Sequence, residues 1–199
     1  FYDFFTVQVK YLTLCCYLIK THDVEIYNLI PPDDLPKIIL NLFKNCPNEM
    51  PHLRKDLLAS MRSLLNALNK YREAFVTDID QFFNDDIIIG TGWTTKETLR
   101  PTAYGVIYDL IHHLREKLTM KQLKLALHVY SKTVYDESTS VMIHVMTCRL
   151  LLNTSDSFYR AALREKCFHE IRPILYEIFF HYTHKVCRCE PNLLVINFY

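Results

Sequence analysis

Four side chains near the end of the chain are of the types that bind soft metal ions. His181, His184, Cys187 and Cys189 lie close together, and the first three recur every three residues. On a continuous helix this spacing places them along one face, and nitrogen and sulfur donors in this number suit zinc. The pattern His-x2-His followed by Cys-x-Cys is, however, not a usual zinc-ligand spacing. We therefore expect no metal or cofactor, and keep a small metal-binding or redox protein as the alternative.

The segment Gly90-Thr91-Gly92 is the second candidate, since glycine-rich loops bind phosphate groups. No Lys-Ser or Lys-Thr pair follows at P-loop spacing, and the third glycine of a dinucleotide fingerprint is absent. We interpret the segment as a tight turn between helices with Trp93 packed beside it.

Catalytic side chains show no recognisable arrangement. The acidic pairs at 33–34, 85–86 and 136–137 fall at expected helix starts or in loops, where capping accounts for them. His112 and His113 are adjacent, so they diverge by about 100° on a helix and cannot chelate one ion together. We predict that the chain is not an enzyme.

The composition indicates which fold must position these groups. Of 199 residues, 50% are hydrophobic, and 23 basic against 22 acidic residues give a net charge of +1. This balance argues against a direct nucleic-acid binder, which needs an excess of basic residues. Only 3 glycines are present, too few for the turns of a β-sandwich or a nucleotide-binding α/β fold. We predict an all-α protein.

The apolar pattern divides the chain into amphipathic segments joined by short turns, as helical hairpins require. In the first segment we expect the buried stripe to be Phe4, Val7, Tyr11, Leu14 and Leu18. No apolar run approaches the length of a membrane span, and no signal peptide is visible. We thus expect an intracellular chain or an internal fragment, with its 7 cysteines reduced. Helices are expected at 1–20, 35–45, 49–70, 73–83, 94–117, from 119, at 136–152 and at 158–185.

Two segments of the chain are similar to each other at a fixed offset. Leu53-Arg54 aligns with Leu99-Arg100 at an offset of 46 residues, and a looser third copy begins 42 residues further on, near Met142. Two helices per 40–47 residues is the range of HEAT and armadillo repeats. The predicted fold is an α-solenoid of about four such hairpins, in which the two arginines bond to the preceding turn and to acidic residues of the next repeat.

Several blocks of the sequence carry a family resemblance, and they occur in a consistent order. They are Asp3-Phe4-Phe5-x-x-Gln8-Val9-Lys10, Cys46-Pro47-x-Glu49-x-Pro51-His52-Leu53-Arg54-Lys55, Asp86-Ile87-Ile88-Ile89-Gly90-x-Gly92-Trp93-Thr94, Lys96-Glu97-Thr98-Leu99-Arg100-Pro101, Asp109-Leu110-Ile111-His112-His113-Leu114-Arg115 and Cys148-Arg149-Leu150-Leu151-Leu152-Asn153. Together they resemble the TRRAP family over residues 1–153. Residues 154–199 are interpreted as a further helical hairpin or a divergent tail.

The resemblance implies a part of the N-terminal HEAT-repeat region of a very large protein related to the phosphatidylinositol-3-kinase-related kinases. The kinase-like domain of that family has lost catalytic residues and lies outside this sequence. Its members scaffold histone acetyltransferase complexes of the SAGA type in the nucleus and receive transcriptional activators. A repeat from another giant kinase-related protein is a further alternative.

From solenoid geometry we expect protein partners to contact the face of the second helices, with neither nucleic acid nor membrane bound directly. The candidate contact residues on this face are Lys55, Arg62, Arg100, His113 and Arg115.

Overall fold

The computed structural model describes residues 2–22, 31–67 and 69–188, and this part of the chain contains helices and no strand. The long helices are α1 (Tyr2–Thr21), α3 (Asp34–Asn45), α4 (Pro51–Leu65), α8 (Trp93–Leu114), α9 (Met120–Val134), α10 (Val141–Glu165) and α11 (Ile171–Arg188). Short pieces connect them: α5 (Asn69–Glu73), η1 (Ala74–Val76), α6 (Ile79–Phe82), α7 (Asp85–Ile88) and η2 (Phe168–Glu170). The predicted all-α class is confirmed.

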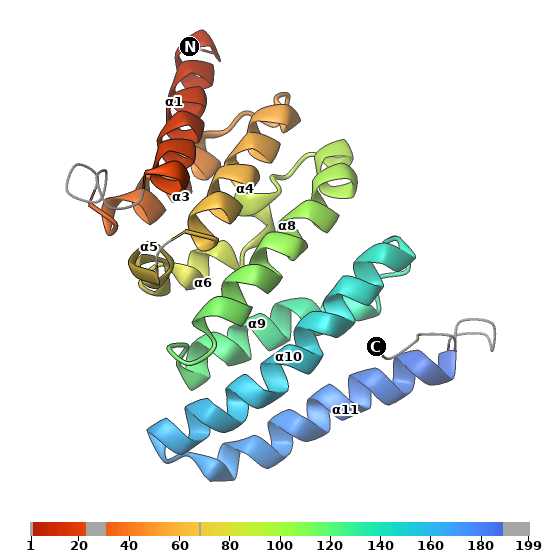
Figure 1. Cartoon of the computed structure of the whole chain (residues 1–199). Helices are drawn as coiled ribbons and strands as arrows, with labels where there is room; N and C mark the ends of the chain where they lie inside the picture. Colours follow the sequence, from red (N-terminus) through yellow and green to blue (C-terminus); the bar gives the residue numbers. More distant parts are fainter. Residues whose placement is uncertain (1, 23–30, 68, 189–199) are drawn as a thin grey trace.

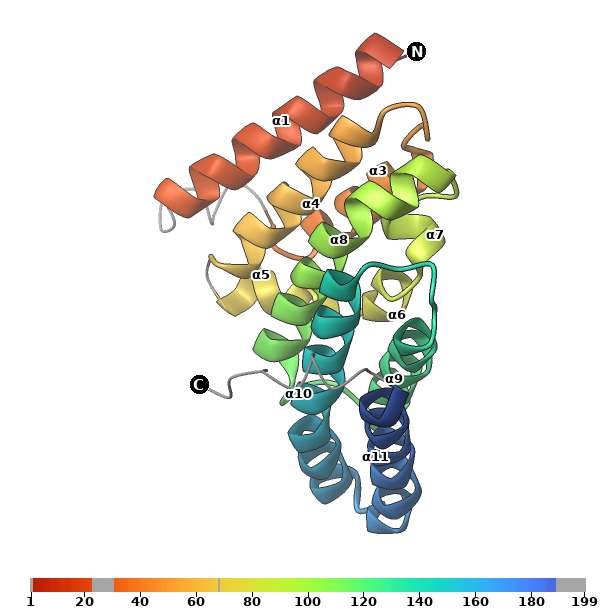
Figure 2. The same cartoon turned by 90° about the vertical axis from the view of Figure 1, so that its right-hand side faces the viewer.

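The helices form two layers that run the length of the molecule. The first layer consists of helices that pack side by side in the order α1, α4, α8 and α10. The second layer consists of α3, the short pieces from α5 to α7, α9 and α11. Figure 1 shows this progression from α1 at one end to α11 at the other, and Figure 2 shows the two layers from the side. One continuous apolar core lies between them. This is the layered stacking of a helical solenoid, in which each unit contacts its neighbours.

One set of polar contacts between successive rungs joins residues at almost constant sequence separation. Side chains in one rung bond to groups 44 to 47 residues away in the next, close to the predicted offset of 46. The pairs are Lys10–Asp56, Thr13–Ser60, Arg62–Asp109, Gln122–Val76, Glu165–Met120, Arg160–Glu116, Lys124–Glu170 and His181–Tyr135. The repeat therefore extends across the described residues, including those beyond 153.

Helix α4 shows how the sequence dictates one of these rungs. Pro51 is the first helical residue, where the missing N–H costs least. The apolar stripe that follows is fully buried, with 0% exposure for Leu53, Leu57, Leu58, Met61, Leu64 and Leu65. Such a stripe at 3.6-residue spacing packs between the neighbouring helices of both layers.

The buried face of α1 differs from the predicted one. Phe5, Val9 and the residues that continue their stripe face α4, whereas Phe4 and Tyr11 are 68% and 65% exposed. The prediction was wrong because α1 is apolar on both sides, so hydrophobic spacing alone does not select the face that packs. The buried stripe is Phe5, Val9, Leu12, Cys16 and Ile19, and the exposed apolar face is Phe4, Val7, Tyr11, Leu14 and Tyr17.

Several predicted helix boundaries were also wrong. Residues 153–157, a polar run that resembles a turn, lie inside α10, and the break falls at Lys166, whose φ of 57° is left-handed. The expected helix at 73–83 is divided into η1 and α6. Helix α8 begins at Trp93, so Pro101 lies inside it rather than near its start.

Candidate protein-binding surface

Arg54 connects three segments of the chain from a buried position at the start of α4. Its side chain is only 3% exposed, and Nη2 donates to the carbonyl of Cys46 at 2.8 Å in the preceding turn. Nη1 donates to the carbonyl of Ile87 at 2.7 Å in α7 of the next rung. Burial lowers the pKa of Arg54, and the two carbonyls supply the hydrogen bonds that make a buried cation tolerable. Arg54 thus bonds to the preceding turn as predicted, whereas its partner in the next rung is a backbone carbonyl and not the predicted acidic residue.

Gly90 lies against this arginine and has the conformation of a tight turn. Its φ is +93°, which side chains rarely adopt, and a Cβ there would lie 2.7 Å from Asn48 Oδ1 and 3.0 Å from Arg54 Cζ. Asn48 Nδ2 donates to Thr91 Oγ1 at 2.9 Å, which fastens the loop to the α3–α4 turn. The glycine loop is therefore a tight turn between α7 and α8, as predicted, and it also closes a junction between rungs. The side chain of Trp93 lies outside the described residues.

Arg100 occupies the equivalent position one rung later. Its Nη1 lies 3.7 Å from Asp136 Oδ2, in the turn between α9 and α10. Asp136 Oδ1 also accepts from the Ser138 hydroxyl at 2.5 Å and from the Ser138 N–H at 3.0 Å. These hydrogen bonds, followed by the charge of Arg100, lower the pKa of Asp136 and keep it ionised.

The five predicted contact residues do not form a single patch. Lys55 is exposed on α4, and Arg62 Nε donates to Asp109 Oδ2 at 2.8 Å, which joins α4 to α8. Arg100 lies two turns into α8, whereas His113 and Arg115 lie at its end, about 20 Å away along the helix axis.

His113, at the end of α8, contacts Arg72 of the short helix α5. Arg72 Nη1 lies 3.2 Å from His113 Nδ1, and burial and this guanidinium lower the pKa of His113. The same arginine donates from Nη2 to the carbonyl of Ala67 at 2.9 Å. The end of α8 is thus tied to the α4–α5 turn.

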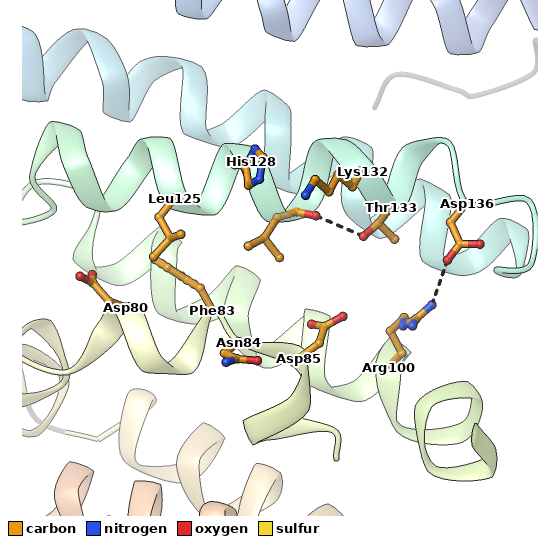
Figure 3. Close-up of a pocket in the computed structure, with 11 residues that line it drawn as sticks. Asp80, Phe83, Asn84, Asp85, Arg100, Leu125, His128, Lys132, Thr133 and Asp136 are labelled. Carbon is orange, nitrogen blue, oxygen red and sulfur yellow. Dashed lines mark hydrogen bonds and ion pairs between the residues drawn. The ribbon is translucent and has the colours of Figure 1, made fainter. Parts of the chain in front are cut away.

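A groove that the sequence did not reveal lies on the other layer, between the α6–α7 turn and α9. It encloses about 490 Å³ and is open to solvent. Figure 3 shows its two walls, with Asp80, Asn84 and Asp85 on one side and Leu125, Lys132 and Thr133 on the other. Arg100 and Asp136 close one end. The remaining lining residues are Phe83, His128 and Val129.

A buried network of hydroxyl groups supports the floor of this groove. Tyr104 Oη donates to Asp85 Oδ2 at 3.0 Å and lies 3.2 Å from Thr133 Oγ1. Its ring packs edge-on against Tyr130, with centroids 4.9 Å apart. Burial and the nearby carboxylate of Asp85 raise the pKa of Tyr104, so it stays protonated and acts as a donor. The network joins α7, α8 and α9 and holds the groove walls in place.

A second groove continues from the first across α9. It encloses about 460 Å³ between α9 and α11, and His128 lines both. Lys124, which bonds to Glu170, and Ile174 are among its other residues. Neither groove was predicted, because their residues come from several elements and no short motif links them.

The histidine–cysteine group is only partly described. His181 Nδ1 lies 2.6 Å from the hydroxyl of Tyr135, and His184 packs edge-on against the same ring. The side chain of Cys187 and all of Cys189 lie outside the described residues. Within the described part of the chain, no three ligating side chains converge on a metal position. Among the same residues, no helix is long and apolar enough to cross a membrane.

Comparison with known proteins bears directly on the class of this fold. The family model described as the Tra1 HEAT repeat central region matches residues 1–193. The chain is 38% identical over 154 residues to the human transformation/transcription domain-associated protein, and 30% identical over 195 residues to the probable transcription-associated protein 1 of Dictyostelium discoideum. It is 31% identical over 151 residues to the SAGA complex/NuA4 acetyltransferase complex subunit TRA1 of Saccharomyces cerevisiae. These matches cover 77%, 96% and 76% of the chain, and 4% of each relative.

The stacked helical pairs, their contacts at constant separation and the grooves between rungs define an α-solenoid of the HEAT type. The chain belongs to the Tra1/TRRAP family. The matching model is described as the central HEAT-repeat region, whereas the resemblance implied the N-terminal repeat region. The match also continues past residue 153. The division into 1–153 and 154–199 stays a prediction, and α10 runs continuously through it.

Proposed function

We propose that the chain is a non-catalytic scaffold segment of a transcription coactivator in histone acetyltransferase complexes. Its partners are protein subunits of those complexes and transcriptional activators, and it works in the nucleus. The names of the relatives support this, since the yeast protein is a subunit of SAGA and NuA4 acetyltransferase complexes. The chain corresponds to 4% of that relative, so the function concerns a part of a longer assembly.

The observation that carries the proposal is the ladder of contacts at 44 to 47 residues. Charged side chains such as Arg54, Arg62 and Arg100 join rungs to each other. A rigid series of rungs with open grooves presents extended surface to other proteins, which is how solenoids bind. The exposed apolar side chains on α1 and α11 fit a ladder that continues into neighbouring repeats.

The candidate contact residues are tested in the complete protein that contains this chain. A tagged protein with Lys55→Glu and Arg115→Glu is purified, and the histone acetyltransferase activity that co-purifies is measured. We expect a loss of co-purified subunits and activity, because both changes reverse charge on the α4–α8 face.

Arg62 needs a variant that separates partner binding from its contact with Asp109. The exchange Arg62→Asp with Asp109→Arg keeps the pair between α4 and α8 and reverses its direction. If Arg62 contacts a partner, the exchanged protein loses that partner although its melting temperature is unchanged. Co-purification equal to wild type in every one of these variants would contradict the proposed contact face.

A further inference from the structure

The groove between the α6–α7 turn and α9 holds two charges that the fold leaves without a partner. Asp80 and Lys132 are exposed and form no ion pair with any residue that the structure describes. Neighbouring charges are paired: Lys124 with Glu170 in the next groove, and Arg100 with Asp136 at one end of this one. Asp80 and Lys132 are therefore available to bind opposite charges on another molecule.

The two charges lie at different positions along the groove. In Figure 3, Asp80 lies beside Leu125, whereas Lys132 lies further along α9, toward Asp136. Leu125 and Lys132 are seven residues apart on α9, a rise of about 10 Å or two helical turns. The groove thus has an unpaired acid at the Leu125 end and an unpaired base two helical turns further along, where Arg100 and Asp136 pair with each other. Asp85, which also lines the groove, accepts a hydrogen bond from Tyr104.

An apolar strip lies between these ends. Leu125 is 37% exposed although it is a leucine on an amphipathic helix, Val129 is half-buried, and Phe83 closes the strip from the α6 side. An exposed apolar strip with charges at its two ends matches the anchors of an amphipathic helix, which recur at i, i+3, i+4 and i+7.

We propose that this groove binds an amphipathic helix of a protein partner, with a basic residue beside Asp80, aliphatic residues on Leu125 and Val129, and an acidic residue beside Lys132. The two charges of the bound helix lie seven positions apart, with the aliphatic residues between them. The proposal deepens the scaffold function and rests on it. The second groove extends the surface beyond His128, so a helix longer than two turns remains in contact with the protein.

The test uses the full chain and three labelled peptides that differ only in two positions. The mixed peptide is an alanine- and glutamine-based helix with Arg at i, Leu at i+3 and i+4, and Glu at i+7. The dibasic peptide has Arg at both charged positions, and the diacidic peptide has Glu at both. Fluorescence anisotropy at low salt measures each Kd. We expect the mixed peptide to bind about threefold tighter than either of the others, as one exposed ion pair provides.

Reversing either charge in the protein should change which peptide binds most tightly. Asp80→Lys is expected to prefer the diacidic peptide, and Lys132→Glu the dibasic one, whichever way the helix lies. Leu125→Ala weakens binding of the mixed peptide about tenfold, because an anchor contact is lost. Asp34→Lys and Lys37→Glu on α3 are matched controls, since they change net charge equally at exposed sites away from the groove. Circular dichroism melting confirms that each variant is folded.

Two results would overturn the proposal: no binding of the mixed peptide to the folded chain, or preferences that follow net charge, so that the α3 controls behave like the groove variants. Either result leaves the scaffold function standing, because co-purification with acetyltransferase activity tests that function separately.

Discussion

Arg54 and Arg100 occupy equivalent positions on successive rungs, yet they connect those rungs by different chemistry. Arg54 is 3% exposed and donates to two backbone carbonyls, those of Cys46 and Ile87. Arg100 pairs at 3.7 Å with Asp136, whose side chain is 40% exposed. The first junction is buried and uses hydrogen bonds to neutral groups, and the second is an ion pair at the edge of a groove.

The difference in surroundings determines how much each junction stabilises the fold. Removing a hydrogen-bond partner from a buried cation is destabilising, because water cannot take the place of that partner. The same holds for buried carbonyls that lose their donor. A partly exposed ion pair is replaced by water at little cost. The ladder is therefore expected to be rigid at the α3–α4–α7 junction and more adaptable at the α8–α9–α10 junction, where the groove lies.

The largest expected effect comes from Arg54→Met, which keeps the apolar stem and removes both hydrogen bonds. We expect the free energy of unfolding to fall by about 3 kcal/mol, since bonds to charged groups are each worth about 1.5–3 kcal/mol and part of the loss is offset by removing a buried charge. Urea denaturation followed by circular dichroism measures this. The neighbour Lys55→Met, at an exposed site, is the control. Equal stabilities of the two variants would contradict a special role for Arg54.

The next largest effect is expected at Gly90, which lies against the guanidinium of Arg54. Gly90→Ala forces a side chain into a positive φ and places its Cβ 2.7 Å from Asn48 Oδ1, so we expect a loss of about 2 kcal/mol. Gly105→Ala is the control, since it lies within α8, where alanine is preferred, and meets only the flexible ends of Arg62 and Met146. Its stability should change by less than about 1 kcal/mol. Thermal melting of both variants separates strain at the junction from a general effect of added methyl groups.

The same contrast explains what could be predicted from the sequence. The all-α class follows from the low number of glycines. The offset of 46 follows from the pairs Leu53-Arg54 and Leu99-Arg100, because a solenoid repeats similar residues along the chain. The buried stripe of α4 can be recognised in the sequence because its polar and apolar faces are distinct. The stripe of α1 was predicted wrongly, because Phe4 and Phe5 are equally apolar and only the position of α4 decides between them.

The break predicted at 153–157 failed for a local reason. Ser and Thr side chains often form turns, yet in α10 they bond back to carbonyls of their own helix. Thr154 Oγ1 donates to the carbonyl of Leu151 at 2.7 Å, and Ser155 Oγ to that of Leu152 at 2.8 Å. The helix thereby continues through a polar run and ends only at Lys166. The groove escaped prediction because it arises from the packing of α6, α7 and α9 against each other.

A third, smaller effect is expected at the Arg100 junction, and it depends on pH. Asp136→Asn should lower the stability at pH 7 by about 0.5 kcal/mol, the scale of a partly exposed pair. The pKa of Asp136 is lowered from its ordinary value of 3.8 in the folded state, so the carboxylate contributes stability above pH 3.8. This contribution is lost as the pH falls through the lower, folded-state pKa. Urea denaturation at pH 7 and near pH 3 should show the wild-type advantage narrowing, and a constant difference would contradict the assignment.

The smallest effect is expected for Arg62 and Asp109, which join α4 to α8 at the surface. Their Nε–Oδ2 distance is 2.8 Å, but the side chains are 47% and 27% exposed, so water competes for both charges. A double-mutant cycle with Arg62→Ala and Asp109→Ala should give a coupling energy of about 0.3 kcal/mol, at the low end for exposed ion pairs. Salt should reduce this coupling further, because screening acts on exposed charges, whereas the loss in Arg54→Met should not change with salt. A coupling energy as large as the effect at Arg54 would contradict the comparison. It would mean that the exposed pair stabilises the fold as much as the buried arginine does.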